Sequence, residues 1–397
     1  MLQLDAVQTL ALAGLALFLG YALCRFVPVF ARYNLPPPVV GGLVVAVAVL
    51  LARQRGVTLF ELDTSLQSPL MIAFFTTIGI NASLALLKVS GRQVMVFLAL
   101  ATAFAVAQNL LGMAVAAGFG LHPLFGVLAG STTLTGGPAT GLAFAPLFEA
   151  AGVRGAESVA VAAAMAGIVL GGLVGGPAIT VLIRRHGLHG RAHGREPVIE
   201  QVDAQSPLDD ASREFKALQA IVVLLLAMWL GHWVSQGIAA LGLTMPAYIG
   251  AMLVGAAFRN LDDFTSWLKL PVATIELIGN VCLALFLSVA LMNLKLWELS
   301  GLALPLLVNL ALQVAMVVLF CGVVFRVMGR DYDAAVMGGG FIGFMLGTTA
   351  DAMAVMRTLT ERYGVAPRAF LVAPLVGAFF IDFTNALIIT GFINFWR

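Results

Sequence analysis

The sequence predicts an all-α polytopic membrane protein with two inverted repeats of five transmembrane helices, each containing a re-entrant helical hairpin. Composition, the length of the apolar segments and two matched Gly-rich segments carry this prediction. The chain is 60% hydrophobic and 11% charged, with a mean hydropathy of +0.99, whereas a soluble domain carries about 25% charged residues. The 22 Lys+Arg and 20 Asp+Glu nearly cancel. We therefore expect a lipid bilayer around the protein and no nucleic-acid partner.

Ten apolar segments are candidate membrane spans, because a transmembrane helix needs about 20 largely apolar residues. In chain order they cover residues 6–24, 39–52, 69–87, 94–118, 159–183, 217–240, 246–258, 272–292, 299–325 and 369–395. The second span of each half is short and follows a proline, which is well tolerated in a first helical turn. The charged segment 186–214 separates the halves 1–185 and 215–397. The sequence thus predicts two five-span domains joined by a linker.

Two polar, Gly-rich segments interrupt the apolar pattern at matching places in the two halves. Residues 130–141 read GSTTLTGGPATG, and residues 337–351 read MGGGFIGFMLGTTAD. Irregular backbone at membrane depth is tolerated only where protein or a water-filled cavity surrounds it. Paired broken segments in the two halves of a membrane protein point to a transporter's binding site.

The length of each Gly-rich region favours a hairpin that enters and leaves on the same side. Residues 123–152 number 30 and would be about 45 Å long as a helix, while two crossings need about 60 Å. The region 331–364 leads to the same conclusion. A single broken crossing is the alternative, and the basic residues decide between the two.

Basic residues favour the re-entrant arrangement with the N-terminus outside. In that topology 17 of the 22 Lys+Arg are cytoplasmic, whereas single crossings place only 9 of them inside. Cytoplasmic loops carry the excess of Lys and Arg. Because each half then has an odd number of spans, the halves are inverted, both termini are periplasmic and the linker is cytoplasmic.

Asp382 is the most informative single residue, since it is the only charge near the centre of the predicted last span. An aspartate at mid-membrane is costly and marks a functional site by default. Asn385 lies at i+3 on the same helical face. We expect Asp382 and Asn385 to form a metal site that binds a sodium ion through their side-chain oxygens, with the hydroxyls of Ser131 and Thr349 as further ligands. The alternative is that Asp382 and Asn385 are a structural polar pair.

The two Gly-rich segments supply the candidate substrate ligands. They offer hydroxyl groups and accessible backbone N–H and C=O groups, and a half-helix that starts after a break directs free N–H groups toward an anion. The candidates are Ser131, Thr132, Thr133, Thr135, Gly136, Gly137 and Thr140 in the first hairpin, and Gly343, Gly347, Thr348, Thr349 and Asp351 in the second. Asp351 binds a substrate ammonium group or a cation in this interpretation; its alternative role is to cap a helix. Close helix packing is the alternative for any single glycine.

The fourth and ninth predicted spans contain four amide side chains, those of Gln108, Asn109, Asn309 and Gln313. We expect them to form interhelical hydrogen bonds.

Several long stretches give the chain a family resemblance. LPPPVVGGL (35–43), SPLMIAFFTTIGINA (68–82), GSTTLTGG (130–137), LFLSVALMNLKLWEL (285–299) and VGAFFIDFTNAL (376–387) resemble the sodium/glutamate symporter family. The resemblance implies a homodimeric inner-membrane carrier, not an enzyme, that uses no cofactor and takes up glutamate with Na⁺ as coupling ion. It also implies an elevator motion. The chain differs from the family's usual pattern at Pro138, Phe341 and Ala350, where histidine or proline is common.

The sequence reasoning leaves rival functions open. A proton-coupled carrier of another organic anion would use Asp351 or Asp382 as the titrating group. An intramembrane aspartyl protease would pair the same two carboxylates, but the Gly-x-Gly-Asp sequence of such proteases is absent from the chain. A channel is a third alternative, although channel filters are built as symmetric rings.

Overall fold

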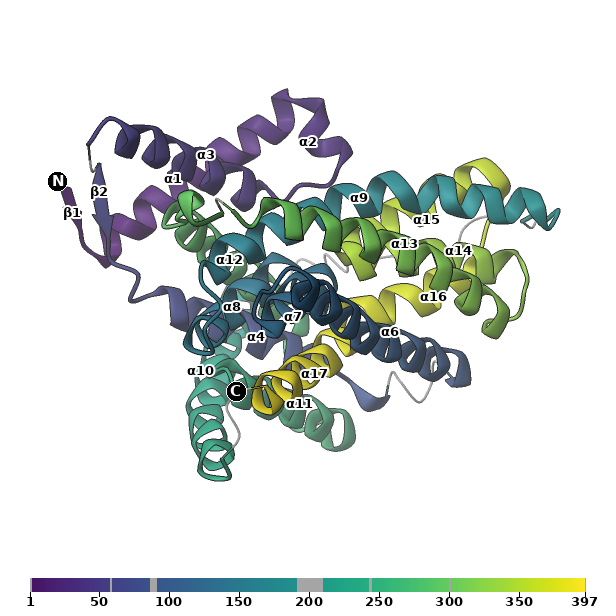
Figure 1. Cartoon of the computed structure of the whole chain (residues 1–397). Helices are drawn as coiled ribbons and strands as arrows, with labels where there is room; N and C mark the ends of the chain where they lie inside the picture. The colour runs from purple at the N-terminus through teal and green to yellow at the C-terminus, as the bar shows by residue number, and fades with distance from the viewer. Residues whose placement is uncertain are drawn as a thin grey trace.

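A computed structural model describes residues 2–57, 59–85, 91–190, 210–242, 245–299 and 301–396. Helices dominate the described residues (Figure 1). Most of the expected linker lies outside the described residues, because 191–209 belong to none of these ranges.

The elements of the two halves follow a matching order. The first half contains β1 (Leu2–Leu4), α1 (Ala6–Phe26), α2 (Pro28–Arg32), α3 (Pro37–Gln54), β2 (Phe60–Leu62), α4 (Gln67–Asn81), α6 (Gly91–Gly118), α7 (Pro123–Val127), the π-helical turn η1 (Leu128–Thr132), α8 (Gly137–Ala150) and α9 (Ala156–Arg185). The second half contains α10 (Asp210–Ala240), α11 (Tyr248–Thr265), α12 (Val272–Met292), the 3₁₀ turn η2 (Leu296–Leu299), α13 (Ala303–Val327), α14 (Tyr332–Leu346), α15 (Thr349–Tyr363), α16 (Pro367–Leu375), the π-helical turn η3 (Val376–Phe380) and α17 (Ile381–Phe395).

The helices pack as two groups. In the first group, α4 packs on α11 and α12, α1 packs on α3 and α12, and α10 packs on α11. In the second group, α14 packs on α9, α13, α15 and α16, while α6 packs on α7 and α13; Figure 1 shows α9, α13, α14 and α15 alongside one another. The first half gives α1, α2, α3 and α4 to the first group, and the second half gives it α10, α11 and α12. The remaining α-helices of both halves form the second group.

Seven described helices are long and apolar enough to cross a membrane: α1, α3, α6, α9, most of α10, α12 and α13. Two of the ten expected spans differ from the prediction: helix α4 has 15 residues, and α11 ends in a polar turn with two aspartates, Asp262 and Asp263. The expected span 369–395 is formed by α16, η3 and α17, and its backbone stays helical through the π-helical turn η3. Asp382 therefore lies near the middle of this helix, directly after its π-helical turn.

The first Gly-rich segment forms two short helices with two irregular points between them. Pro123 opens α7 after the His122 cap, and Gly130 has non-helical backbone angles (φ −104°, ψ −128°) inside η1. Gly137 adopts φ +68° at the start of α8, a left-handed conformation that favours glycine. The break expected from the sequence is thus present.

The second Gly-rich segment is a pair of packed helices, α14 and α15, joined at Gly347 and Thr348. The Asp331 side chain caps α14 by accepting from Ala334 N at 2.8 Å. Thr348 is the N-cap of α15, and Asp351 completes a capping box with it. The helices therefore end and begin where the sequence predicted a break.

One feature was not expected from the sequence: a short parallel ladder pairs Leu2–Leu4 with Phe60–Leu62. The all-α prediction is wrong for these six residues. The N-terminal strand precedes α1 and the second follows α3, and because these two helices pack together, the extended segments at their ends lie side by side.

Candidate functional site

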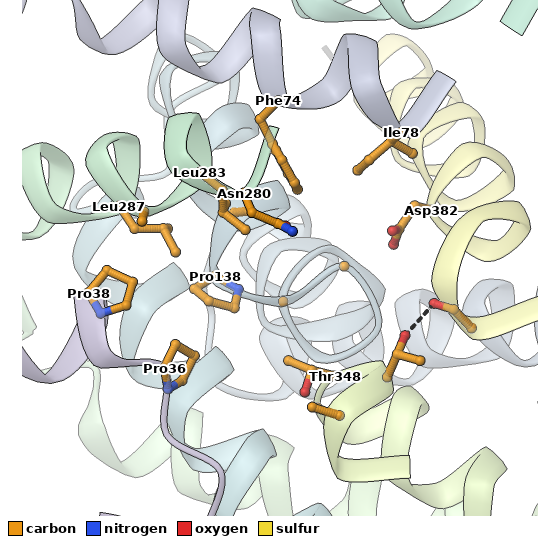
Figure 2. A pocket seen from close by; sticks show the side chains of 18 of the residues that line it. Pro36, Pro38, Phe74, Ile78, Pro138, Asn280, Leu283, Leu287, Thr348 and Asp382 are labelled. Carbon is orange, nitrogen blue, oxygen red and sulfur yellow. Dashed lines mark hydrogen bonds between the residues drawn. The ribbon is translucent and has the colours of Figure 1, made fainter. Parts of the chain in front are cut away.

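A cavity of about 550 Å³ lies where the breaks of the two hairpins meet the first helix group. Residues 135–139 of the first hairpin and 347–350 of the second both line it. The opposite walls come from α4, which supplies Phe74 and Ile78, and from α12, which supplies Asn280 and Leu283 (Figure 2). Segments about 210 residues apart in sequence thus share one cavity, which is the arrangement that the paired Gly-rich segments predicted.

Two helix N-termini meet at this cavity. Helix α8 begins at Gly137 after the Gly136 cap, and α15 begins at Thr349 after the Thr348 cap, and all four residues line the cavity. The first N–H groups of a helix have no partner within the helix, and they carry a partial positive charge. The cavity therefore presents two sets of anion-binding groups.

The charged side chains of the cavity are all acidic. Asp382 and Glu276 line it, and none of the described lining residues is Lys or Arg. Figure 2 shows the Asp382 carboxylate facing the cavity between Ile78 and Thr348. Two carboxylates in one cavity favour a bound cation, because like charges in a poorly hydrated site repel one another.

Gln108 connects the two hairpins through hydrogen bonds, outside the cavity lining. Its Oε1 accepts a hydrogen bond from Thr135 Oγ1 at 2.6 Å, and its Nε2 donates to Met345 O at 2.8 Å. Gln108 is fully buried. The expected interhelical role of this residue is confirmed, and its partners are the tips of the two hairpins.

A second polar network holds the break at η1. Asn309 Nδ2 donates to Ala129 O at 2.6 Å, Asn385 Nδ2 donates to Ser131 O at 2.9 Å, and Ser131 N donates to Asn109 Oδ1 at 2.9 Å. Three helices, α6, α13 and α17, thereby contribute one amide side chain each. The network satisfies backbone groups that the irregular turn leaves free.

The structure divides the sequence-predicted residues into two sets. Thr135, Gly136, Gly137, Gly347, Thr348, Thr349 and Asp382 line the cavity. Ser131, Thr132, Thr133, Thr140, Gly343, Asp351 and Asn385 are buried outside its lining. The structure therefore brings only the first set to this cavity, and the second set lies outside its lining.

Local hydrogen bonds explain several members of the buried set. Thr133 Oγ1 donates to Leu128 O at 2.8 Å, and Asp351 Oδ2 accepts from Thr348 N at 2.9 Å and from Thr348 Oγ1 at 2.7 Å. Asp351 thus has the capping role that was the alternative to ligand binding. Of the four residues expected to share one sodium ion, Asn385 Nδ2 donates to Ser131 O at 2.9 Å, Thr349 Oγ1 donates to Gly377 O at 2.7 Å, and Asp382 lines the cavity.

Sequence reasoning missed two polar residues on α12. Glu276 and Asn280 line the cavity and are four residues apart, so they share a helical face. A charged residue inside the predicted span 272–292 was the signal that could have found them.

Comparisons with known proteins show what this chain is similar to. A family model described as "Sodium/glutamate symporter" matches residues 2–365. The chain is 41% identical over 394 residues to a sodium/glutamate symporter of Escherichia coli (strain K12), covering 98% of this chain and 97% of the relative. It is 38% identical over 390 residues to a sodium/glutamate symporter of Haemophilus influenzae, covering 96% of this chain and 95% of that relative.

Proposed function

The chain belongs to the sodium/glutamate symporter family, and from this premise we propose that it moves glutamate or a related small carboxylate across the membrane together with Na⁺, through the cavity between its two hairpin tips. Membership of a transporter family means that the chain is a carrier and not an enzyme. The observation that carries the location of the site is the meeting of two helix N-termini in one cavity, whose described lining contains neither Lys nor Arg.

The substrate carboxylates bind at the two helix N-termini. The free N–H groups at the starts of α8 and α15 hold them, because a helix N-terminus binds anions through oriented N–H groups and its dipole. Glutamate has two carboxylates, and the two hairpins provide one such N-terminus for each. Discontinuous helices bind anionic substrates in this way in other secondary transporters.

Asp382 binds a cation in the same cavity. The carboxylates of Asp382 and Glu276 and those of the substrate would repel one another, so a positive charge must accompany the substrate. The coupling Na⁺ at Asp382 supplies it, and the substrate ammonium group faces Glu276 on the opposite wall. Binding of ion and substrate is then mutually favourable, since coupled ligands affect each other's affinity reciprocally.

The cavity opens toward the cytoplasm. Under the topology favoured by the basic residues, the end of α1, the start of α3, the end of α4 and the start of α12 are cytoplasmic. These ends supply Tyr21, Pro36, Asn81 and Glu276 to the cavity. With this topology, the proposal takes the present conformation as the inward-facing state of the carrier.

The two helix groups perform the transport movement. The group that contains both hairpins carries the ligands and slides against the group of α1, α3, α4, α10, α11 and α12, in an elevator motion. The exposed apolar face of α10, with Trp229 61% and Trp233 59% exposed, faces lipid or the second subunit of a homodimer in the inner membrane.

Uptake into proteoliposomes tests the function. Radiolabelled glutamate should accumulate when Na⁺ is outside and K⁺ inside, and an unlabelled panel of amino and dicarboxylic acids should rank as competitors. Accumulation that follows a proton gradient and ignores Na⁺ would replace this proposal with the proton-coupled alternative.

Membrane orientation is tested by cysteine labelling of right-side-out vesicles with an impermeant thiol reagent. In a variant lacking Cys24, Cys282 and Cys321, a cysteine at Gln3 should react and one at Leu188 should react only after permeabilisation. The reverse pattern contradicts the topology and the inward-facing assignment together.

A further inference from the structure

Four buried oxygen atoms without hydrogen-bond partners surround the break at η1. They are Ser131 Oγ, Thr132 Oγ1, Asn309 Oδ1 and Asn385 Oδ1, which find no partner among the described residues. All four residues are fully buried, with 0% of their surface exposed. Buried polar atoms are rarely unpartnered in native proteins, and such a group calls for an ion, a water molecule or another explanation.

The hydrogen bonds at η1 relate these oxygens to one turn of the chain. Asn309 Nδ2 donates to Ala129 O at 2.6 Å, and Asn385 Nδ2 donates to Ser131 O at 2.9 Å. Each of these amides therefore contacts the backbone of η1 through one end and has its Oδ1 at the other end. Ser131 and Thr132 are consecutive residues of η1, so each of the four oxygens belongs to η1 or to a side chain that hydrogen-bonds to it.

The chemistry of the four atoms favours a cation. The two amide oxygens can only accept hydrogen bonds, and the two hydroxyls can accept as well. The unpartnered donors here are Asn109 Nδ2 and the two hydroxyls, and none of them makes a hydrogen bond to either amide oxygen. A cation binds oxygen lone pairs and needs no donor. Since none of the four groups is charged, a monovalent ion fits better than Ca²⁺ or Mg²⁺, which proteins bind through carboxylates.

We propose that Ser131 Oγ, Thr132 Oγ1, Asn309 Oδ1 and Asn385 Oδ1 form a Na⁺ site at the break of the first hairpin, separate from Asp382. This assignment rests on the proposed function and adds a second ion site to it. Backbone at an unwound helix is a recurrent location for Na⁺ in transporters. Here the ion joins η1 to α13 and α17, which come from the other half of the chain.

The position of the site explains how this ion affects the substrate. Thr135, the first tip residue that lines the cavity, follows Thr132 by three residues, and Asn385 follows Asp382 by three residues on α17. An ion at η1 therefore orders both the first tip and the helix that carries Asp382. Substrate binding is stronger once this ion has bound, and by reciprocity the substrate strengthens ion binding.

Two substitutions test the site without removing a structural hydrogen bond. Ser131→Ala and Thr132→Val each delete a hydroxyl that bonds to no described residue. Thermal stability of the purified protein is measured against NaCl, with choline chloride holding the ionic strength constant. Each variant should raise the Na⁺ midpoint about tenfold or more, because a polar group bound to a charge contributes more than a neutral pair.

Ser288→Ala is the matched control. Its Oγ is also buried and unpartnered among the described residues, but it lies on α12 in the other helix group, so the Na⁺ midpoint should stay at the wild-type value. Asp382→Asn should retain a Na⁺-dependent rise in stability, since the η1 site does not use that carboxylate. If Ser131→Ala and Thr132→Val both keep the wild-type midpoint, the site is not an ion site.

A measurement on the wild-type chain covers the case in which the variants do not fold. Na⁺ should slow amide hydrogen exchange in residues 128–135 relative to choline, and an equal rate in the two salts overturns the site. The two proposals fail separately. Glutamate uptake that ignores Na⁺ contradicts the proposed function, whereas Na⁺-driven uptake with unchanged midpoints in both variants contradicts the η1 site alone.

Discussion

Replacing Gln108 by leucine should loosen both hairpins at once. Leucine is close to glutamine in length and leaves no cavity, but it removes the acceptor of Thr135 Oγ1 and the donor to Met345 O, now at 2.6 and 2.8 Å. The remaining partner of Thr135 Oγ1 is the weak acceptor Met345 Sδ at 3.4 Å. Two hydrogen bonds between the hairpins are thus lost inside a fully buried site.

The size of the effect follows from these contacts. A buried group left without its partner destabilises a protein by about 1–3 kcal/mol, so two such groups give a loss of about 2–6 kcal/mol in the free energy of unfolding. Because the hairpin tips also lose their mutual alignment, substrate affinity should fall by about tenfold or more, since 1.4 kcal/mol corresponds to a factor of ten.

Denaturant titration in detergent micelles and substrate binding to the same preparation measure the two effects. Gln313→Leu is the matched control: Gln313 is also fully buried and donates one hydrogen bond, to Gln108 O at 2.8 Å, so its loss should be about half as large. If Gln108→Leu costs no more than Gln313→Leu and leaves substrate affinity unchanged, Gln108 does not align the hairpins.

Three further predictions concern the cavity and the hairpin packing. Asp382→Asn should lower substrate affinity measured in Na⁺ by about tenfold or more, because the variant lacks the negative charge that attracts the bound cation. Wild-type affinity and Na⁺ dependence in this variant would show that Asp382 is structural. A cysteine at Thr348 should react with a small thiol reagent in a cysteine-free variant and be protected by substrate with Na⁺, and no reaction under any condition would contradict the placement of substrate in the cavity. Gly126→Ala should destabilise the chain by about 1–3 kcal/mol or more, because its Cβ would lie 2.0 Å from the Gly112 carbonyl carbon; Gly118→Ala, with nothing within 4 Å, is the control that should have little effect.

The sequence by itself determined the class of protein and the position of its breaks. Low charge and long apolar segments require a lipid surrounding, because such side chains find no favourable place in water. Glycine and hydroxyl residues clustered at 130–141 and 337–351 required irregular backbone, and the structure has its breaks at Gly130, Gly137 and Gly347. These features are local consequences of composition, so they can be derived without knowing which helices meet.

The tertiary structure alone decided which polar residues face the cavity. Ser131 and Thr135 are four residues apart in the same polar segment, yet one is held at η1 by amides from other helices and the other lines the cavity. Asp351 and Thr348 are three residues apart, and the capping box between them holds the Asp351 carboxylate outside the cavity lining. The placement of Ser131, in contrast, depends on hydrogen bonds to side chains more than 20 positions away, which local spacing does not encode.

The π-helical turn ahead of Asp382 has the same origin. The span 369–395 is one apolar helix, as the sequence predicts, and its π-helical turn at 376–380 lies where Thr349 Oγ1 of the second hairpin donates to Gly377 O at 2.7 Å. That contact exists only once the second hairpin has packed against α16. Sequence therefore supplied the carboxylate and the glycine, and the packing of distant segments decided that Asp382 faces the cavity while Asn385 faces the break of the first hairpin.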